Sequence, residues 1–252
     1  RLIVFDHGFG GGHRSYMKEI EMLARRGYKV FSYDHTGCME SEGESANGLG
    51  QSLSDLNDCF NALKKEEKLK GYDFSVMGHS WGGFSTLNIS ALHPEISHVV
   101  VMSGFISVEV MLSQFMPSFL SKPLIKIEKK YNPESLKYNA VETLSKTKAK
   151  VLLIYSDNDP AVKSAVHFDA LKKGLEGKEN IKLMLVSDKG HNPNYTKEAV
   201  KALAEYTKEV NSKRKELTTP ESKRVFRDSF DWEKITEQDE SVWAEIFNTL
   251  DN

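Results

Sequence analysis

The sequence carries a serine flanked by glycines where a predicted strand turns into a predicted helix. Gly-His-Ser-Trp-Gly at 78–82 follows an apolar run (72–77) and precedes apolar side chains at helical spacing (84–92). So sharp a turn strains the backbone of its middle residue and requires small residues on either side. The two glycines of the motif meet that requirement. We therefore expect Ser80 to stand at the tip of the turn as an activated nucleophile.

A serine hydroxyl attacks at neutral pH only when a base removes its proton and a third group orients the base. Of the eight histidines, His191 lies in a turn rich in Gly, Asn and Pro directly after the predicted strand 181–187. Loops that follow parallel strands gather at the carboxyl edge of the sheet, where Ser80 is expected. We therefore expect His191 to be the base.

The orienting acid is expected in the turn after the predicted strand 150–156, at the same edge of the sheet. This turn reads Asp-Asn-Asp-Pro, and either Asp157 or Asp159 could accept the Nδ1 proton of His191. One of them could instead serve only as a turn or helix cap, since Asp before a proline-initiated helix is ordinary capping chemistry. The residues alone leave both alternatives open.

Acyl transfer through a tetrahedral intermediate also needs two hydrogen-bond donors for its oxyanion. We expect one to be the backbone N–H of Trp81, the residue after the serine. The other should come from the loop His-Gly-Phe-Gly-Gly-Gly at 7–12, which follows the first predicted strand. A phosphate-binding loop is a weak alternative, because no Lys-Ser/Thr follows and the Gly-x-Gly-x-x-Gly spacing is absent.

Composition narrows the class of protein. A chain of 252 residues with a formal net charge of −2 can form one large α/β domain and has no overall field that would attract nucleic acid. Cys38 and Cys59 are too few for a disulfide framework, so a reducing, cytoplasmic location is expected. We expect no transmembrane segment, no metal and no organic cofactor. Because the chain opens at Arg1 inside a strand pattern and without Met, we also expect residues upstream of it to be missing.

Short apolar runs alternate with helical patterns along the chain. Strands are predicted at 2–6, 29–33, 73–78, 98–103, 150–156 and 181–187. Helices are predicted at 16–26, 53–68, 83–92, 161–175 and 196–208. Strands that are apolar on both faces and separated by crossover helices indicate an α/β fold, with a mostly parallel sheet of about six strands and helices on both faces.

Two segments interrupt this rhythm. Residues 105–148 replace a simple crossover and are rich in Met and Phe, which favours a short lid over the site and a small acyl substrate with an apolar group. Residues 216–252 are expected to form a C-terminal helical extension with a helix at 231–250 packed on the domain. The predicted core is then 1–104 and 149–215.

Five motifs resemble those of the α/β-hydrolase superfamily in the same chain order. They are His-Gly-Phe-Gly-Gly at 7–11, Asp-His-Thr-Gly through Ser-Glu-Gly at 34–43, Gly-His-Ser-Trp-Gly at 78–82, Asp-Asn-Asp-Pro at 157–160 and Gly-His at 190–191. The stretch at 34–43 is similar to monoacylglycerol-lipase-like and serine-aminopeptidase-like hydrolases. This resemblance covers about residues 1–210 and implies the α/β-hydrolase fold.

The resemblance also implies roles for individual residues. In such enzymes the acid stands immediately before the residue that opens the next helix, which corresponds to Asp159 and gives a triad of Ser80, Asp159 and His191. The second oxyanion donor follows His-Gly, which corresponds to Phe9.

We expect a serine hydrolase that cleaves a carboxylic ester or related acyl compound through an acyl-enzyme intermediate. A peptidase or amidase with the same triad is one alternative, and Glu109 and Glu128 in the predicted lid could then bind a substrate amine. A catalytically silent, ligand-binding protein is another alternative, against which the complete set of three triad residues argues.

Overall fold

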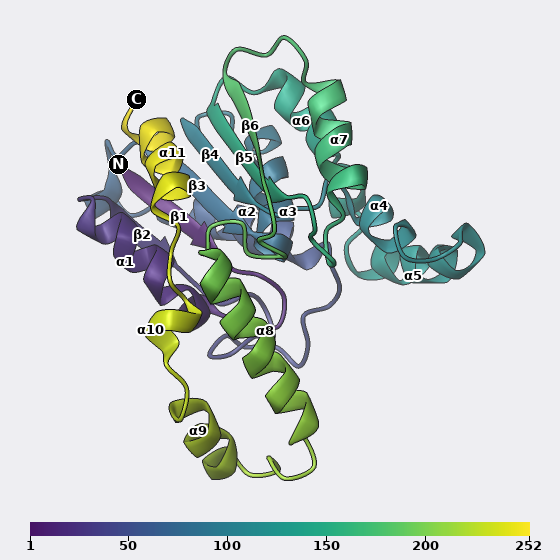
Figure 1. Ribbon diagram of the computed structural model, residues 1–252. Coiled ribbons are helices and arrows are strands. Elements are labelled where there is room, and N and C mark those ends of the chain that lie inside the picture. Colours follow the sequence, from purple (N-terminus) through teal and green to yellow (C-terminus); the bar gives the residue numbers. More distant parts are fainter.

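The computed structural model describes residues 1–252, apart from the side chain of Ser118. Its centre is a six-stranded sheet in the order β2-β1-β3-β4-β5-β6, and every neighbouring pair of strands is parallel (Figure 1). The strands are β1 (Leu2–Asp6), β2 (Lys29–Ser32), β3 (Phe74–His79), β4 (His98–Met102), β5 (Lys150–Ser156) and β6 (Ile181–Val186). The predicted parallel α/β architecture is confirmed.

Helices cover both faces of this sheet. One face carries α1 (Met17–Arg25) and α11 (Glu240–Asp251). The other carries α2 (Gln51–Leu63), α3 (Ser80–Asn88), α6 (Ala140–Lys146) and α7 (Ser164–Gly174). Because successive strand residues point to opposite faces, neighbours such as Val99 and Val100 enter two separate apolar clusters and both are buried.

The prediction of one continuous helix at 231–250 was wrong. The structure divides it into α10 (Trp232–Ile235) and α11. The carboxylate of Asp239 accepts hydrogen bonds from the N–H groups of Ser241 and Val242 and so begins a new helix inside the segment. Val242, Trp243, Ile246 and Leu250 then pack α11 against the sheet.

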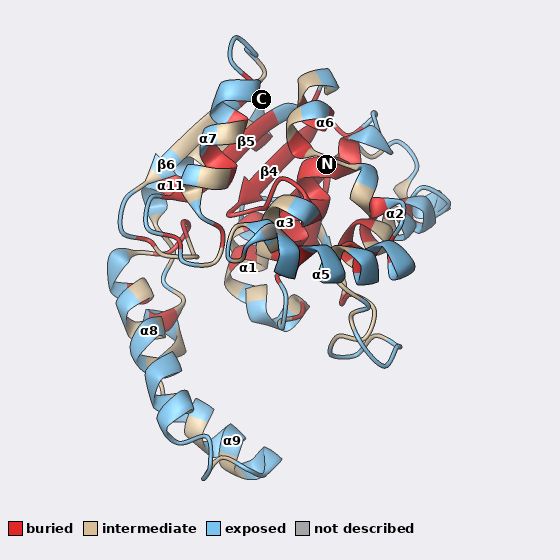
Figure 2. Ribbon diagram, turned by 90° about the vertical axis from the view of Figure 1, so that its right-hand side faces the viewer, coloured by how far each residue is buried: buried red, intermediate tan, exposed pale blue. Residues whose placement is uncertain are grey.

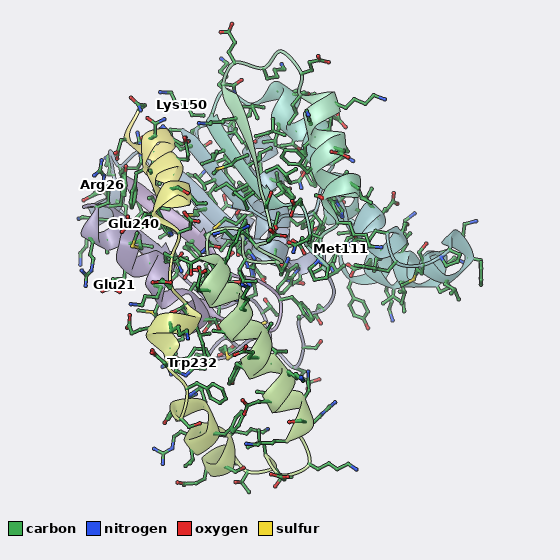
Figure 3. All side chains as sticks on the ribbon, viewed as in Figure 1. Glu21, Arg26, Met111, Lys150, Trp232 and Glu240 are labelled. Atoms are coloured by element: carbon green, nitrogen blue, oxygen red, sulfur yellow. The ribbon has the colours of Figure 1, made fainter. Side chains whose placement is uncertain are left out.

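Two cations hold the carboxyl end of α11. The Arg26 guanidinium pairs with Asp251, and Lys150 Nζ donates to the carbonyl oxygen of Asn252 at 2.6 Å. Arg26 and Lys150 are both labelled in Figure 3, one after α1 and the other at the start of β5. Positive charge at a helix carboxyl end complements the helix dipole, so these contacts favour this position of α11.

The segment between β4 and β5 forms three α-helices of different character. α4 (Val108–Ser113) leads into α5 (Ser118–Tyr131), which projects from the domain (Figure 1). Exposed apolar side chains follow its length: Phe119, Leu120, Leu124 and Ile127. The third helix, α6, instead buries Ala140 and Leu144 in the core.

After β6 the chain builds a helical arm from α8 (Lys197–Ser212) and α9 (Pro220–Asp228). The arm extends away from the sheet and is largely exposed (Figures 1 and 2). α9 folds back onto α8 where Tyr206 stacks on Phe226, with ring centroids 6.1 Å apart. Among the described residues, no helix is both long enough and apolar enough to cross a bilayer.

Candidate active site

Ser80 occupies a strained turn between β3 and α3. Its φ of 57° is left-handed, which a residue with a side chain rarely adopts. A Cβ atom on Gly78 would lie 2.2 Å from Thr86 Oγ1, and one on Gly82 would lie 2.3 Å from the carbonyl oxygen of Asp6. Both glycines are therefore required by close packing, which is the physical reason for the motif.

A continuous pair of hydrogen bonds joins three residues from the carboxyl edge of the sheet. Ser80 Oγ lies 2.7 Å from His191 Nε2, and His191 Nδ1 lies 2.8 Å from Asp159 Oδ2. The Asp159 side chain is fully buried, whereas 24% of the His191 side chain is exposed. The structure thus brings together the serine, the histidine and one of the two aspartates that the sequence singles out.

The environment of Asp159 keeps it ionised. Its Oδ1 accepts the N–H groups of Ala161 at 2.8 Å and Val162 at 3.0 Å. Burial by itself raises the pKa of the Asp159 carboxyl, but the hydrogen bond and charge of His191, with these two N–H groups, outweigh burial and lower it. A carboxylate so held can orient an imidazole and offset its positive charge.

Asp157 has a different set of partners. Its carboxylate is exposed and accepts the N–H of Asp188 at 3.0 Å, which ties the turn after β5 to the turn after β6. That backbone hydrogen bond is the main reason that the pKa of Asp157 is lowered. Asn158 Oδ1 accepts the N–H of Gly190 at 2.8 Å in the same way. These contacts leave Asp159 as the carboxylate that faces His191.

The two residues expected at an oxyanion hole, Phe9 and Trp81, contact each other. Trp81 lies in the first turn of α3, where backbone N–H groups have no partner within the helix. The Phe9 ring packs edge-on against the Trp81 ring, with centroids 5.2 Å apart. Gly82 N–H donates to the His7 carbonyl at 3.0 Å and joins α3 to the loop that contains Phe9.

A buried ionic cluster behind this loop was missed by sequence reasoning. His35 lies between two carboxylates, with Nε2 2.6 Å from Asp6 Oδ1 as an ion pair and Nδ1 3.1 Å from Asp55 Oδ2. Burial lowers the pKa of His35, but the charge of Asp6 and the bonds to Asp55 and Asp6 raise it to about 9. The ring is therefore positively charged at neutral pH. Its own backbone N–H donates to His7 Nε2 at 3.0 Å.

One signal in the sequence could have revealed this cluster. Asp6 ends an otherwise apolar strand that is buried throughout, and a buried charge requires a partner. Nothing in the local sequence indicated that His35 would be the partner of Asp6 or that it would also contact Asp55 of α2. The two carboxylates come together around His35 only in the folded chain.

Glu109 and Glu128, two carboxylates of the predicted lid, have different environments. Glu109 is exposed on α4. Glu128 of α5 is buried and accepts the N–H groups of Leu49 and Gly50 and the side-chain amide of Asn132. The Glu128 carboxylate therefore anchors α5 to the loop before α2.

Sequence comparison places the chain among known hydrolases. A family profile described as "Serine aminopeptidase, S33" matches residues 1–183. A monoglyceride lipase of Saccharomyces cerevisiae is 27% identical over 107 residues, which are 41% of this chain and 33% of the yeast protein. The matched part of the chain thus spans about a third of that relative's length.

Solved structures show the same fold. A monoacylglycerol lipase of Paleococcus ferrophilus superposes with a TM-score of 0.62 at 22% identity, covering 81% of this chain and 93% of the other. Est1E of Butyrivibrio proteoclasticus, solved with ferulic acid, gives a TM-score of 0.61 at 20% identity, covering 82% and 88%. These likenesses confirm the α/β-hydrolase fold.

Proposed function

This chain belongs to the S33 serine aminopeptidase family of α/β-hydrolases, and from that premise we propose that it is a serine hydrolase that cleaves a carboxylic ester or related acyl compound. The observation that carries the proposal is the unbroken path of hydrogen bonds from Asp159 through His191 to Ser80. Such a path activates a serine hydroxyl and is the arrangement of a catalytic triad.

The reaction proceeds through an acyl-enzyme intermediate. His191 Nε2 takes the proton of Ser80 as Oγ attacks the acyl carbonyl, and Asp159 stabilises the imidazolium that forms. The backbone N–H groups of Phe9 and Trp81 bind the oxyanion. His191 then gives its proton to the leaving alcohol, and water, activated by the same histidine, releases the acid and restores Ser80.

The contacts of Glu128 and the exposed apolar side chains of α5 favour an ester over a peptide as the substrate. Glu128, which could have bound the amine of a peptide, already accepts backbone N–H groups in a buried site. Exposed apolar side chains on α5 and at Phe9 support a substrate with an apolar acyl or aromatic group. The names of the relatives, monoglyceride lipase and monoacylglycerol lipase, agree with this class of substrate.

The test is hydrolysis of p-nitrophenyl esters of increasing acyl length beside the matching p-nitroanilides. We expect turnover of the esters with little turnover of the anilides, and a fall of about 10³-fold or more in kcat for Ser80→Ala. A Ser80→Ala variant that hydrolyses the esters at the wild-type rate would rule out the proposed nucleophile. Preferential cleavage of the anilides would favour the peptidase alternative.

A further inference from the structure

Two side chains outside the triad join the loops that surround Ser80. The Tyr16 hydroxyl lies 3.0 Å from the backbone nitrogen of Gly8 and 2.7 Å from His79 Nδ1. His79 Nε2 lies 2.7 Å from the carbonyl oxygen of His191. The contacts therefore run without interruption from the glycine loop after β1 to the backbone of the histidine loop after β6.

The protons along this path can be assigned one by one. The His191 carbonyl only accepts, so His79 Nε2 must carry a proton. Burial, with a smaller effect of the nearby His191 ring, lowers the pKa of His79 to about 3, so the ring is neutral and its Nδ1 is an acceptor. Desolvation raises the pKa of Tyr16, whose hydroxyl stays protonated and donates to that Nδ1. The Tyr16 oxygen then accepts the N–H of Gly8.

The identity of residue 8 fits this close approach. A Cβ atom at Gly8 would lie 2.6 Å from the Tyr16 hydroxyl oxygen and 3.4 Å from His79 Nδ1. Any side chain there would push the hydroxyl out of place, so a glycine is required for the Gly8 backbone to reach Tyr16.

We propose that Tyr16 and His79 are positioning residues that hold the oxyanion loop, the serine turn and the histidine loop in register through one oriented chain of hydrogen bonds. The inference rests on the proposed function, since it assigns a purpose to the relative placement of Phe9, Ser80 and His191. Gly8 precedes Phe9, His79 precedes Ser80, and the chain ends on His191 itself. Phe9 and Ser80 are thus each next in sequence to a residue of this hydrogen-bonded network, and His191 belongs to the network itself.

This arrangement matters because the three loops follow different strands and must keep one relative position during the reaction. The oxyanion donors must meet the reacting oxygen at hydrogen-bond distance, and an error of about 1 Å can cost around a hundredfold in rate. The three hydrogen bonds, in which every donor has one acceptor, favour one relative position of the loops.

The kinetic test compares Tyr16→Phe, His79→Leu and His79→Gln with the wild-type chain on a p-nitrophenyl ester, with active sites counted by fluorophosphonate titration. We expect kcat per active site to fall about tenfold or more in Tyr16→Phe and His79→Leu, with KM within about twofold of wild type. His79→Gln can still donate to the His191 carbonyl and should recover part of the loss. The double variant Tyr16→Phe/His79→Leu should lose little more kcat than either single variant, because both substitutions break the same series of hydrogen bonds.

Tyr28→Phe is the matched control, because it removes a tyrosine hydroxyl that bonds Asp251. It should keep the wild-type kcat. If Tyr16→Phe also kept the wild-type kcat per active site, or lost only its count of active sites, the two residues would be merely structural and the inference would be wrong.

Nitrogen-15 NMR of the histidine rings tests the hydrogen bonds of His79 to Tyr16 and His191 independently of enzymatic activity. We expect one neutral ring, protonated at Nε2 and absent from His79→Gln, that does not titrate between about pH 5 and 8 and whose Nδ1 signal shifts in Tyr16→Phe. A His79 ring that titrates in this range, or carries its proton on Nδ1, would overturn the inference. An inactive wild-type chain with the expected His79 signals would instead refute the proposed function.

Discussion

At the residue scale, the orienting acid is decided by which carboxylate faces His191. The sequence pattern left Asp157 and Asp159 equivalent, because both follow the same strand and either can cap a turn. The structure separates them by their partners, with Asp159 buried against the imidazole and Asp157 exposed against the Asp188 backbone. A family resemblance pointed to Asp159, but the physical basis of the choice, the direction of each side chain, was not present in the sequence.

Asparagine replacements test this distinction. Asp159→Asn should lower kcat by about 10⁴-fold, because the amide can no longer fix the tautomer of His191 or offset its charge. Asp157→Asn should lower kcat by less than about tenfold, since it disturbs only a turn. Ester hydrolysis by the two purified variants gives the ranking, and the opposite order would reject Asp159 as the acid.

The charge of His35 predicts how stability depends on pH. The folded chain raises the pKa of His35 from 6.5 to about 9, so between these values the native state binds more protons than the unfolded state. Stability from this histidine is therefore complete below pH 6.5 and is lost as the pH rises through about 9. The shift corresponds to a loss of roughly 3 kcal/mol.

Urea unfolding from pH 6 to 10 measures this dependence. The free energy of unfolding of the wild-type chain should fall across this range by more than that of His35→Gln, whose residue 35 has no proton to lose. Parallel curves for the two proteins would show that His35 is not held as a cation between Asp6 and Asp55.

At the element scale, helix α5 of the predicted lid is connected to the loop before α2 and through it to Trp81. Glu128 accepts the N–H groups of Leu49 and Gly50, and the Leu49 carbonyl accepts the indole N–H of Trp81 at 2.7 Å. The sequence predicted a lid in this segment but neither its helices nor this buried anchor, because Glu128 lies in a charged run that resembles a solvated surface. Only the fold reveals that Glu128 is buried and Glu109 is exposed.

Replacement of Glu128 should therefore destabilise the chain. Glu128→Leu leaves two N–H groups without their acceptor and should lower the free energy of unfolding by about 1–3 kcal/mol. The exposed Glu109→Gln is the matched control and should change it by less than about 0.5 kcal/mol. Equal effects in urea unfolding would mean that the Glu128 contacts contribute nothing to holding α5.

At the scale of the whole molecule, burial is concentrated in the sheet and the helices on its two faces. The sequence predicted all six strands and the parallel sheet, since short apolar runs that alternate with helical patterns are typical of a parallel sheet. The sequence did not predict how the helices after β6 are arranged in space. The arm of α8 and α9 leaves the domain, and α11 returns to complete one face of the core, a return set by tertiary packing rather than by local pattern (Figure 2).

Two aromatic truncations should report this difference in burial. Trp243 of α11 is 1% exposed, and Trp243→Ala should cost about 3–5 kcal/mol of stability through the cavity it leaves. Phe226 of the arm is only partly buried, and Phe226→Ala should cost less than about 1.5 kcal/mol. Chemical denaturation compares them, and a larger loss for Phe226→Ala would contradict a core that lies on the sheet.

The central claim is that Ser80 is the nucleophile of a Ser-His-Asp triad, and the most direct measurement is the site of covalent modification. The wild-type chain would be treated with a fluorophosphonate, digested and mapped by mass spectrometry. We predict a single adduct on Ser80, formed at least about 10²-fold more slowly in His191→Ala because the serine loses its base. An adduct on another residue, or an equal rate of labelling without His191, would contradict the account.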